Sequence, residues 1–160
     1  MKRVLPLLVP ALIFTIGLGP VQAVSTPVIQ GQVSGLELCE QAVCGQAIFV
    51  AAFVGRVGAN PFALGIVAVA VTHDPLPGPF DCAAITGGSW DLWAAGRHFH
   101  GNVTGTLFNT GQNTYVVRTA LTLTSGGTGT LSAQALLDHN VFPPTIKGLL
   151  SQNPVSPCFS

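Results

Sequence analysis

Charged residues are scarce in this chain of 160 residues, in which Lys and Arg number 6, Asp and Glu number 6, and together they make up 8%. The few charges are scattered along the chain, and none of them forms a run. Proteins that bind nucleic acid carry a basic patch or stripe, and the sequence contains none. We therefore expect no nucleic-acid partner.

Motifs of several enzyme classes are also absent. There is no Gly-x-Ser-x-Gly elbow, so an α/β-hydrolase is not indicated. The pairs Gly87-Gly88 and Gly126-Gly127 lack the Lys and the following helix of a phosphate-binding loop. No two carboxylates lie close together on one predicted strand, which leaves no glycosidase pair to propose. The sequence thus offers no identifiable catalytic machinery and calls for no cofactor.

The first 23 residues have the pattern of a secretory signal peptide. Two cations precede an apolar run from Val4 to Leu18, and Val21-Gln22-Ala23 supplies a signal-peptidase site. The rival interpretation is a membrane anchor, but the run is short of the roughly 20 residues that a span needs and two prolines interrupt it. We predict cleavage after Ala23, a secreted or periplasmic location, and no stable membrane span after cleavage.

The rest, residues 24–160, is long enough for one domain with a real core and a Pro-rich C-terminal tail. Its 4 cations and 6 anions leave a net charge of −2. No Cys-x-x-Cys is present, so zinc and redox motifs are poorly supported. An even number of cysteines in an exported chain predicts disulfides among Cys39, Cys44, Cys82 and Cys158.

Three cysteine pairings are open in principle. We predict Cys39–Cys44, because these residues flank a four-residue loop and can face each other across a hairpin. That leaves Cys82 to pair with Cys158 and to tie the tail to the Pro-rich loop that contains Pro75, Pro77 and Pro79.

About eight short strands with tight connections predict an all-β domain, an antiparallel up-and-down β-barrel or sandwich. The run Ala47–Val54 has no decisive periodicity and is compatible with a helix, but its β-branched and aromatic content and flanking glycines favour a strand. An outer-membrane barrel also has eight or more alternating strands. It requires a polar lumen and aromatic girdles, which the sequence does not indicate, so a soluble barrel is favoured.

The stretch Trp90–Val103 predicts a β-hairpin with Gly96-Arg97 as a type II′ turn, because glycine suits the positive φ of that turn. This turn pairs Ala94 with Phe99 and Trp93 with His100. Side chains then alternate between two faces. The core face carries Trp90, Leu92, Ala94, Phe99, Gly101 and Val103. The polar face carries Asp91, Trp93, His98, His100 and Asn102.

His98 and His100 share the polar face, with Asp91 diagonally opposite His100. Two imidazoles and a carboxylate can hold zinc, copper or iron, and the loop pairs His73-Asp74 and Asp138-His139 are sources of a ligand beyond the two histidines. The alternative is a solvated face that happens to carry two histidines. Because an outward face offers neither three ligands nor a sheltered cavity, we predict no tightly bound metal.

The first functional hypothesis is an exported small β domain with a binding or structural role. Trp93 and the apolar strands Ala47–Val54 and Phe62–Val71 are candidate contact surfaces for a protein partner or a second copy of the chain. One alternative is a carrier of a small apolar ligand with its pocket inside a barrel. The other is a small metal-dependent enzyme that uses His98 and His100.

Overall fold

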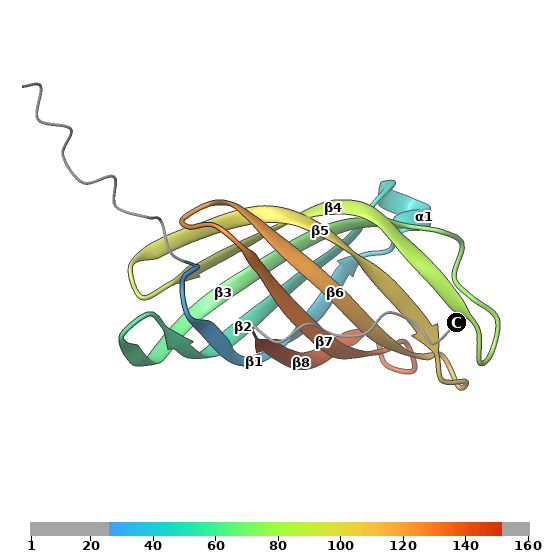
Figure 1. Cartoon of the computed structure of the whole chain (residues 1–160). Coiled ribbons are helices and arrows are strands. Elements are labelled where there is room, and N and C mark those ends of the chain that lie inside the picture. The colour runs from blue at the N-terminus through green and yellow to red at the C-terminus, as the bar shows by residue number, and fades with distance from the viewer. Residues whose placement is uncertain (1–25, 152–160) are drawn as a thin grey trace, which may run out of the picture.

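The computed structural model describes residues 26–151, which form a closed barrel of eight antiparallel strands (Figure 1). Each strand pairs with the next one in the chain, and the last pairs with the first. The prediction of an all-β fold is confirmed, and the barrel is favoured over the sandwich. The elements are β1 (Ile29–Cys39), α1 (Gln41–Cys44), β2 (Ala47–Val57), β3 (Asn60–His73), β4 (Cys82–Ala94), β5 (Arg97–Asn109), β6 (Thr114–Ser125), β7 (Thr130–Asp138) and β8 (Thr145–Ser151).

The two ends of the barrel differ. The turns that follow β2, β4 and β6 lie at one end, while α1 and the connections after β3, β5 and β7 lie at the other (Figure 1). We call the first the packed end and the second the open end.

The predicted signal peptide, its cleavage site and Cys158 lie outside the described residues.

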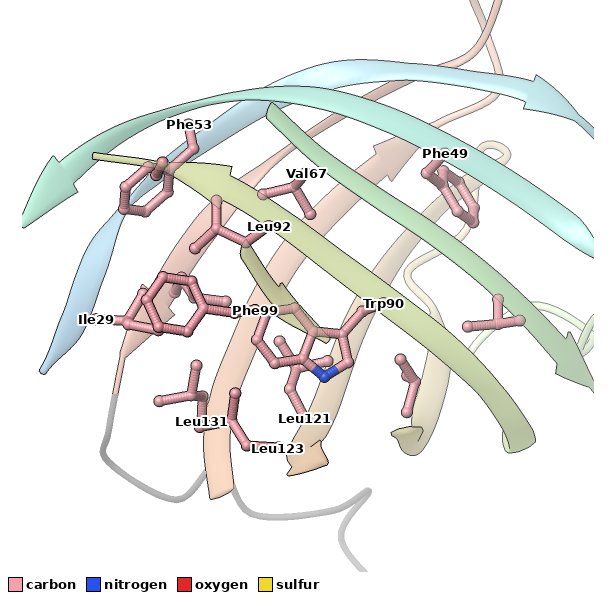
Figure 2. Close-up of a cluster of buried hydrophobic side chains, with 14 of the residues drawn as sticks. Ile29, Phe49, Phe53, Val67, Trp90, Leu92, Phe99, Leu121, Leu123 and Leu131 are labelled. Carbon is pink, nitrogen blue, oxygen red and sulfur yellow. The ribbon is translucent and has the colours of Figure 1, made fainter. Parts of the chain in front are cut away.

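Large side chains fill the half of the barrel next to the packed end, as Figure 2 shows. The largest fully buried residues are Trp90, Phe53, Phe99, Ile29, Leu92, Leu131 and Val103. Thr26 and Pro27 pack against the β6–β7 turn, where a Cβ on Gly127 would come within 2.6 Å of Pro27. Burial of several large apolar side chains in one place, each contributing about 1.5–3 kcal/mol, makes this half the main core.

The hairpin of β4 and β5 has the predicted faces but not the predicted turn. Its turn is Ala95-Gly96, with φ of 52° and 70°, which are the two positive values of a type I′ turn. The prediction of Gly96-Arg97 as the turn was therefore wrong. The observed register pairs Asp91 with His100 and Trp93 with His98.

Contacts made by the hairpin explain the register. Arg97 Nη2 donates to Gly126 O at 3.1 Å, and its guanidinium carbon lies 4.7 Å from the centre of the Phe99 ring. Asp91 Oδ1 contacts both His98 and His100. These contacts offset the roughly 1–2 kcal/mol that a left-handed conformation costs Ala95.

The segment between Cys39 and Cys44 is a short helix, α1, where the sequence suggested a hairpin loop. Gly45 ends the helix in the left-handed region, with φ of 74°. The disulfide Cys39–Cys44 is present in the structure, as predicted. The pairing of Cys82 with Cys158 involves a residue outside the described range and stays a prediction. Within residues 26–151, no helix is long and apolar enough to cross a membrane.

Candidate functional site: a cavity inside the barrel

The half of the barrel next to the open end contains a cavity of about 390 Å³. This volume lies in the range of known small-molecule pockets, roughly 300–1,000 Å³. The space exists because several inward residues in this half are small, whereas those in the packed half are large. Ala47, Ala51, Ala133 and Ala135 all line the cavity. In Figure 2, Phe49, which also lines the cavity, stands apart from the cluster around Trp90.

Most of the cavity wall is apolar. Apolar residues from β1 to β8 contribute to it, including Val33, Val67, Ile85, Leu107, Val117, Leu137 and Ile146. The polar residues that line it are Glu37, Glu40, Gln41, His73, Thr119 and His139. The wall therefore presents apolar surface with polar groups at a few places, the composition typical of a binding pocket.

Ordered segments frame the mouth of the cavity. The Gln41 side chain fixes α1 to β3, since Nε2 donates to His73 O at 2.9 Å and Oε1 accepts from His73 N at 2.7 Å. The Pro-rich loop is held by Asn109, whose Nδ2 donates to Pro77 O at 2.8 Å. Leu76 of that loop lines the cavity. The mouth is thus formed by two restrained segments.

Glu37 and His139 form a charged pair in the cavity wall. Glu37 Oε2 lies 2.9 Å from His139 Nε2, and the side chains are 4% and 15% exposed. Tyr115 packs edge-on against the imidazole, with ring centres 5.3 Å apart. Beyond the contact between them, neither Oε2 nor Nε2 has a hydrogen-bond partner among the described residues.

The pair favours the protonated imidazole. The side-chain contact with Glu37 raises the pKa of His139 above its ordinary value, and Glu40 and Asp138 act in the same direction. Burial acts in the opposite direction but is the smaller effect. His139 therefore keeps its positive charge to higher pH than a free histidine, and Glu37 keeps a neutralising neighbour.

The predicted metal ligands lie together on the outer face of the packed half. Asp91 Oδ1 is 2.7 Å from His98 Nε2 and 2.9 Å from His100 Nδ1. The two imidazoles are 47% and 41% exposed. Trp93 stacks on His98 with parallel rings 4.9 Å apart, and not beside His100 as the predicted register had it. This arrangement is a solvated network of hydrogen bonds around one carboxylate.

Neither suggested source of a further ligand, the pair His73-Asp74 or the pair Asp138-His139, reaches that network. His73 and His139 line the cavity near the open end, whereas His98 follows the turn at the packed end. Asp138 accepts from the backbone and side-chain nitrogens of Asn140, both at 2.9 Å, which is turn chemistry. Within residues 26–151, no three His, Cys, Asp or Glu side chains are placed to hold a metal ion.

Apolar side chains also gather on the outer face, over β1 to β4. Strand pairing places Leu36 opposite Val50, Val54 opposite Leu64, and Ile66 opposite Trp93. All six are exposed, from 36% at Val50 to 74% at Leu64. The sequence offered the apolar strands Ala47–Val54 and Phe62–Val71 as candidate contact surfaces. Their outward side chains lie on this face, which we call the outer apolar surface.

Sequence reasoning missed Glu37. Its signal was the alternation along the first strand, where Ile29, Val33 and Glu37 are separated by even numbers of residues and so lie on the same face. Because Ile29 and Val33 face the lumen, Glu37 faces it as well. His139 had no such signal, because it lies in the connection after β7.

The fold and the cavity define the class: a closed, eight-stranded antiparallel barrel with one packed half and one half that contains an apolar pocket. Comparisons with protein-family models, with curated protein sequences and with solved structures give no match to this chain.

Proposed function

We propose that this protein binds a small, mostly apolar molecule inside its barrel. The observation that carries the proposal is the apolar cavity of about 390 Å³ next to a fully packed core. Protein interiors normally leave few voids larger than a water molecule. A space of this size, lined by the strands themselves, is explained by a ligand that fills it.

The mostly apolar wall favours an apolar ligand, because transfer of apolar surface out of water contributes about 25 cal/mol per Å². The outer network of Asp91, His98 and His100 has exposed imidazoles, and no three such side chains of residues 26–151 are placed to hold a metal ion, so the metal-dependent enzyme is less well supported. Outer-membrane barrels have polar lumens, and the apolar lumen of this barrel supports a binding protein over a pore.

The test is titration with a neutral fluorescent apolar probe, N-phenylnaphthylamine, whose emission rises in apolar surroundings. Ala133 lines the cavity and Ala84 lies on the outer face, so Ala133→Leu and Ala84→Leu add the same side chain inside and outside. We expect saturable binding by the wild type and by Ala84→Leu. Binding should weaken about ten-fold in Ala133→Leu, since added methylenes occupy the ligand's space.

We also propose that the protein acts after export, in the periplasm or outside the cell. The signal-peptide pattern of residues 1–23 supports this location, as does the disulfide Cys39–Cys44, because disulfides persist in oxidising compartments. N-terminal sequencing of exported material should begin at or near Val24. Recovery of the uncleaved chain from the cytoplasm would contradict this location and leave the binding proposal to its own test.

A further inference from the structure

The cavity wall contains a group that a purely apolar ligand would leave unused, the Glu37 carboxylate. Its side chain is 4% exposed and lines the cavity. Oε2 is enclosed beside His139, 2.9 Å from Nε2, and no other described residue donates a hydrogen bond to the carboxylate, so Oε1 is the oxygen open to a ligand. A buried carboxylate is stabilised by every hydrogen-bond donor that reaches it. A ligand that brings a donor to Glu37 therefore gains an interaction that the protein itself does not supply.

The charge around the cavity decides against an anionic ligand. Glu40 also lines the cavity, and none of the described Lys and Arg residues does so. Two histidines, His73 and His139, also line the cavity, and His139 Nε2 faces Glu37 and offsets one of the two carboxylate charges. Glu40 adds a second negative charge that no described Lys or Arg of the lining offsets, so a ligand carboxylate would meet an unfavourable like charge. A hydroxyl or an ammonium group would meet an acceptor of suitable charge.

Two other polar side chains of the wall, those of His73 and Gln41, are already engaged. His73 Nδ1 contacts Asp74 O. The Gln41 amide is used at both atoms by the backbone of His73. Glu37 comes from the inward face of β1 and His139 from the connection after β7, and both residues line the cavity. Glu37 is the nearly buried carboxylate among the described residues of the wall, and a carboxylate is a stronger acceptor than the hydroxyl of Thr119.

We propose that the ligand is an apolar molecule with a hydrogen-bond donor at one end, a hydroxyl or an ammonium group, and that Glu37 is the acceptor that binds this end. This inference rests on the proposed function and adds the chemical class of the ligand. It predicts discrimination against fatty acids and other molecules that end in a carboxylate.

The test uses three probes with the same alkyl chain: decanol, decylammonium and decanoate. Each displaces N-phenylnaphthylamine from the purified protein at neutral pH. We expect decanol and decylammonium to bind at least about ten-fold more tightly than decanoate, the ratio given by one hydrogen bond to a charged acceptor. Equal binding by the three probes would overturn the inference.

Glu37→Gln removes the charge and keeps the shape, and Glu40→Gln is the matched control because Glu40 lines the same cavity. In Glu37→Gln, the preference over decanoate should fall to within about three-fold, and Glu40→Gln should keep most of it. If both variants lose this preference equally, the preference comes from the general negative charge at the mouth of the cavity. That result would contradict the role given to Glu37.

Two failures are distinguishable. If the fluorescent probe binds and the three head groups rank equally, the inference about Glu37 is wrong and the proposed function stands. If neither the probe nor any decyl compound binds, the proposed function fails and the inference fails with it. Because the head-group series is measured on the wild type, poor folding of Glu37→Gln does not remove the test.

Discussion

Glu37 and His139 meet in the wall of an apolar cavity, with Oε2 and Nε2 2.9 Å apart. The contact joins β1 to the connection between β7 and β8, two segments about a hundred residues apart in the sequence. Removing two charges from water is costly, and apolar side chains of similar volume often stabilise a protein as well or better. A charged pair in this position therefore fits the ligand recognition that we propose.

The stability of the protein should depend on pH through His139. The pKa of this imidazole is raised above 6.5 in the folded state, chiefly by its contact with Glu37. The stabilisation is complete below the unfolded value of 6.5 and is lost as the pH rises through the folded pKa. Relative to His139→Gln, the wild-type free energy of unfolding should decline over that window, as measured by denaturant titration. A constant difference between the two proteins would contradict the assignment.

The two tryptophans should differ sharply in their contribution to stability. Trp90 is 1% exposed in the packed half, whereas Trp93 is 46% exposed on the outer face. Trp90→Ala should cost about 3–5 kcal/mol through the lost burial and the cavity it leaves. Trp93→Ala should cost less than about 1 kcal/mol. Chemical denaturation of both variants measures the two free energies of unfolding. Similar decreases in the two variants would contradict the placement of the main core around Trp90.

The disulfide Cys39–Cys44 should stabilise the fold modestly, because it closes a short loop. On the chain-entropy model, a loop of this length contributes about 2 kcal/mol, against about 4 kcal/mol for a bridge from Cys82 to Cys158. Non-reducing peptide mapping should recover Cys39 joined to Cys44. A peptide that joins Cys39 to Cys82 or to Cys158 would contradict the pairing.

The outer histidines should be dispensable for folding and should hold no metal tightly. Exposed charged and polar pairs such as Asp91 with His98 contribute about 0–1 kcal/mol. His98→Ala combined with His100→Ala should therefore unfold at nearly the wild-type denaturant concentration. Metal analysis of protein purified without added metal provides the second measurement. Stoichiometric zinc or copper that disappears in the double variant would favour the metal-dependent enzyme.

The sequence predicted the faces of the β4–β5 hairpin but not its register. When the turn moves from Gly96-Arg97 to Ala95-Gly96, Leu92 exchanges Gly101 for Phe99 as its partner. Those two partners are two positions apart on β5, so they share a face and the alternation of side chains cannot tell the registers apart. Contacts distant in sequence, such as Arg97 with Gly126, accompany the observed register and have no signal in the local pattern.

The cavity was harder to predict from the sequence than the hairpin. Alternation identifies inward residues, but whether Ala51 and Ala133 leave a space depends on what faces them across the closed barrel. Closure brings β8 against β1, and only then does His139 reach Glu37. The alternation along β1 indicated an inward Glu37, whereas the position of His139 in a connection gave no periodic signal.

The most direct measurement is to locate a bound ligand by methyl NMR, with decanol as the probe. Val67, Leu107 and Leu137 line the cavity, while Val54 and Leu64 lie on the outer apolar surface. Binding inside the barrel predicts saturable shifts of the three cavity methyl sets at one decanol per protein, with the two outer residues unchanged. Shifts confined to Val54 and Leu64 would place the apolar binding on the outer surface and contradict a binding site inside the barrel.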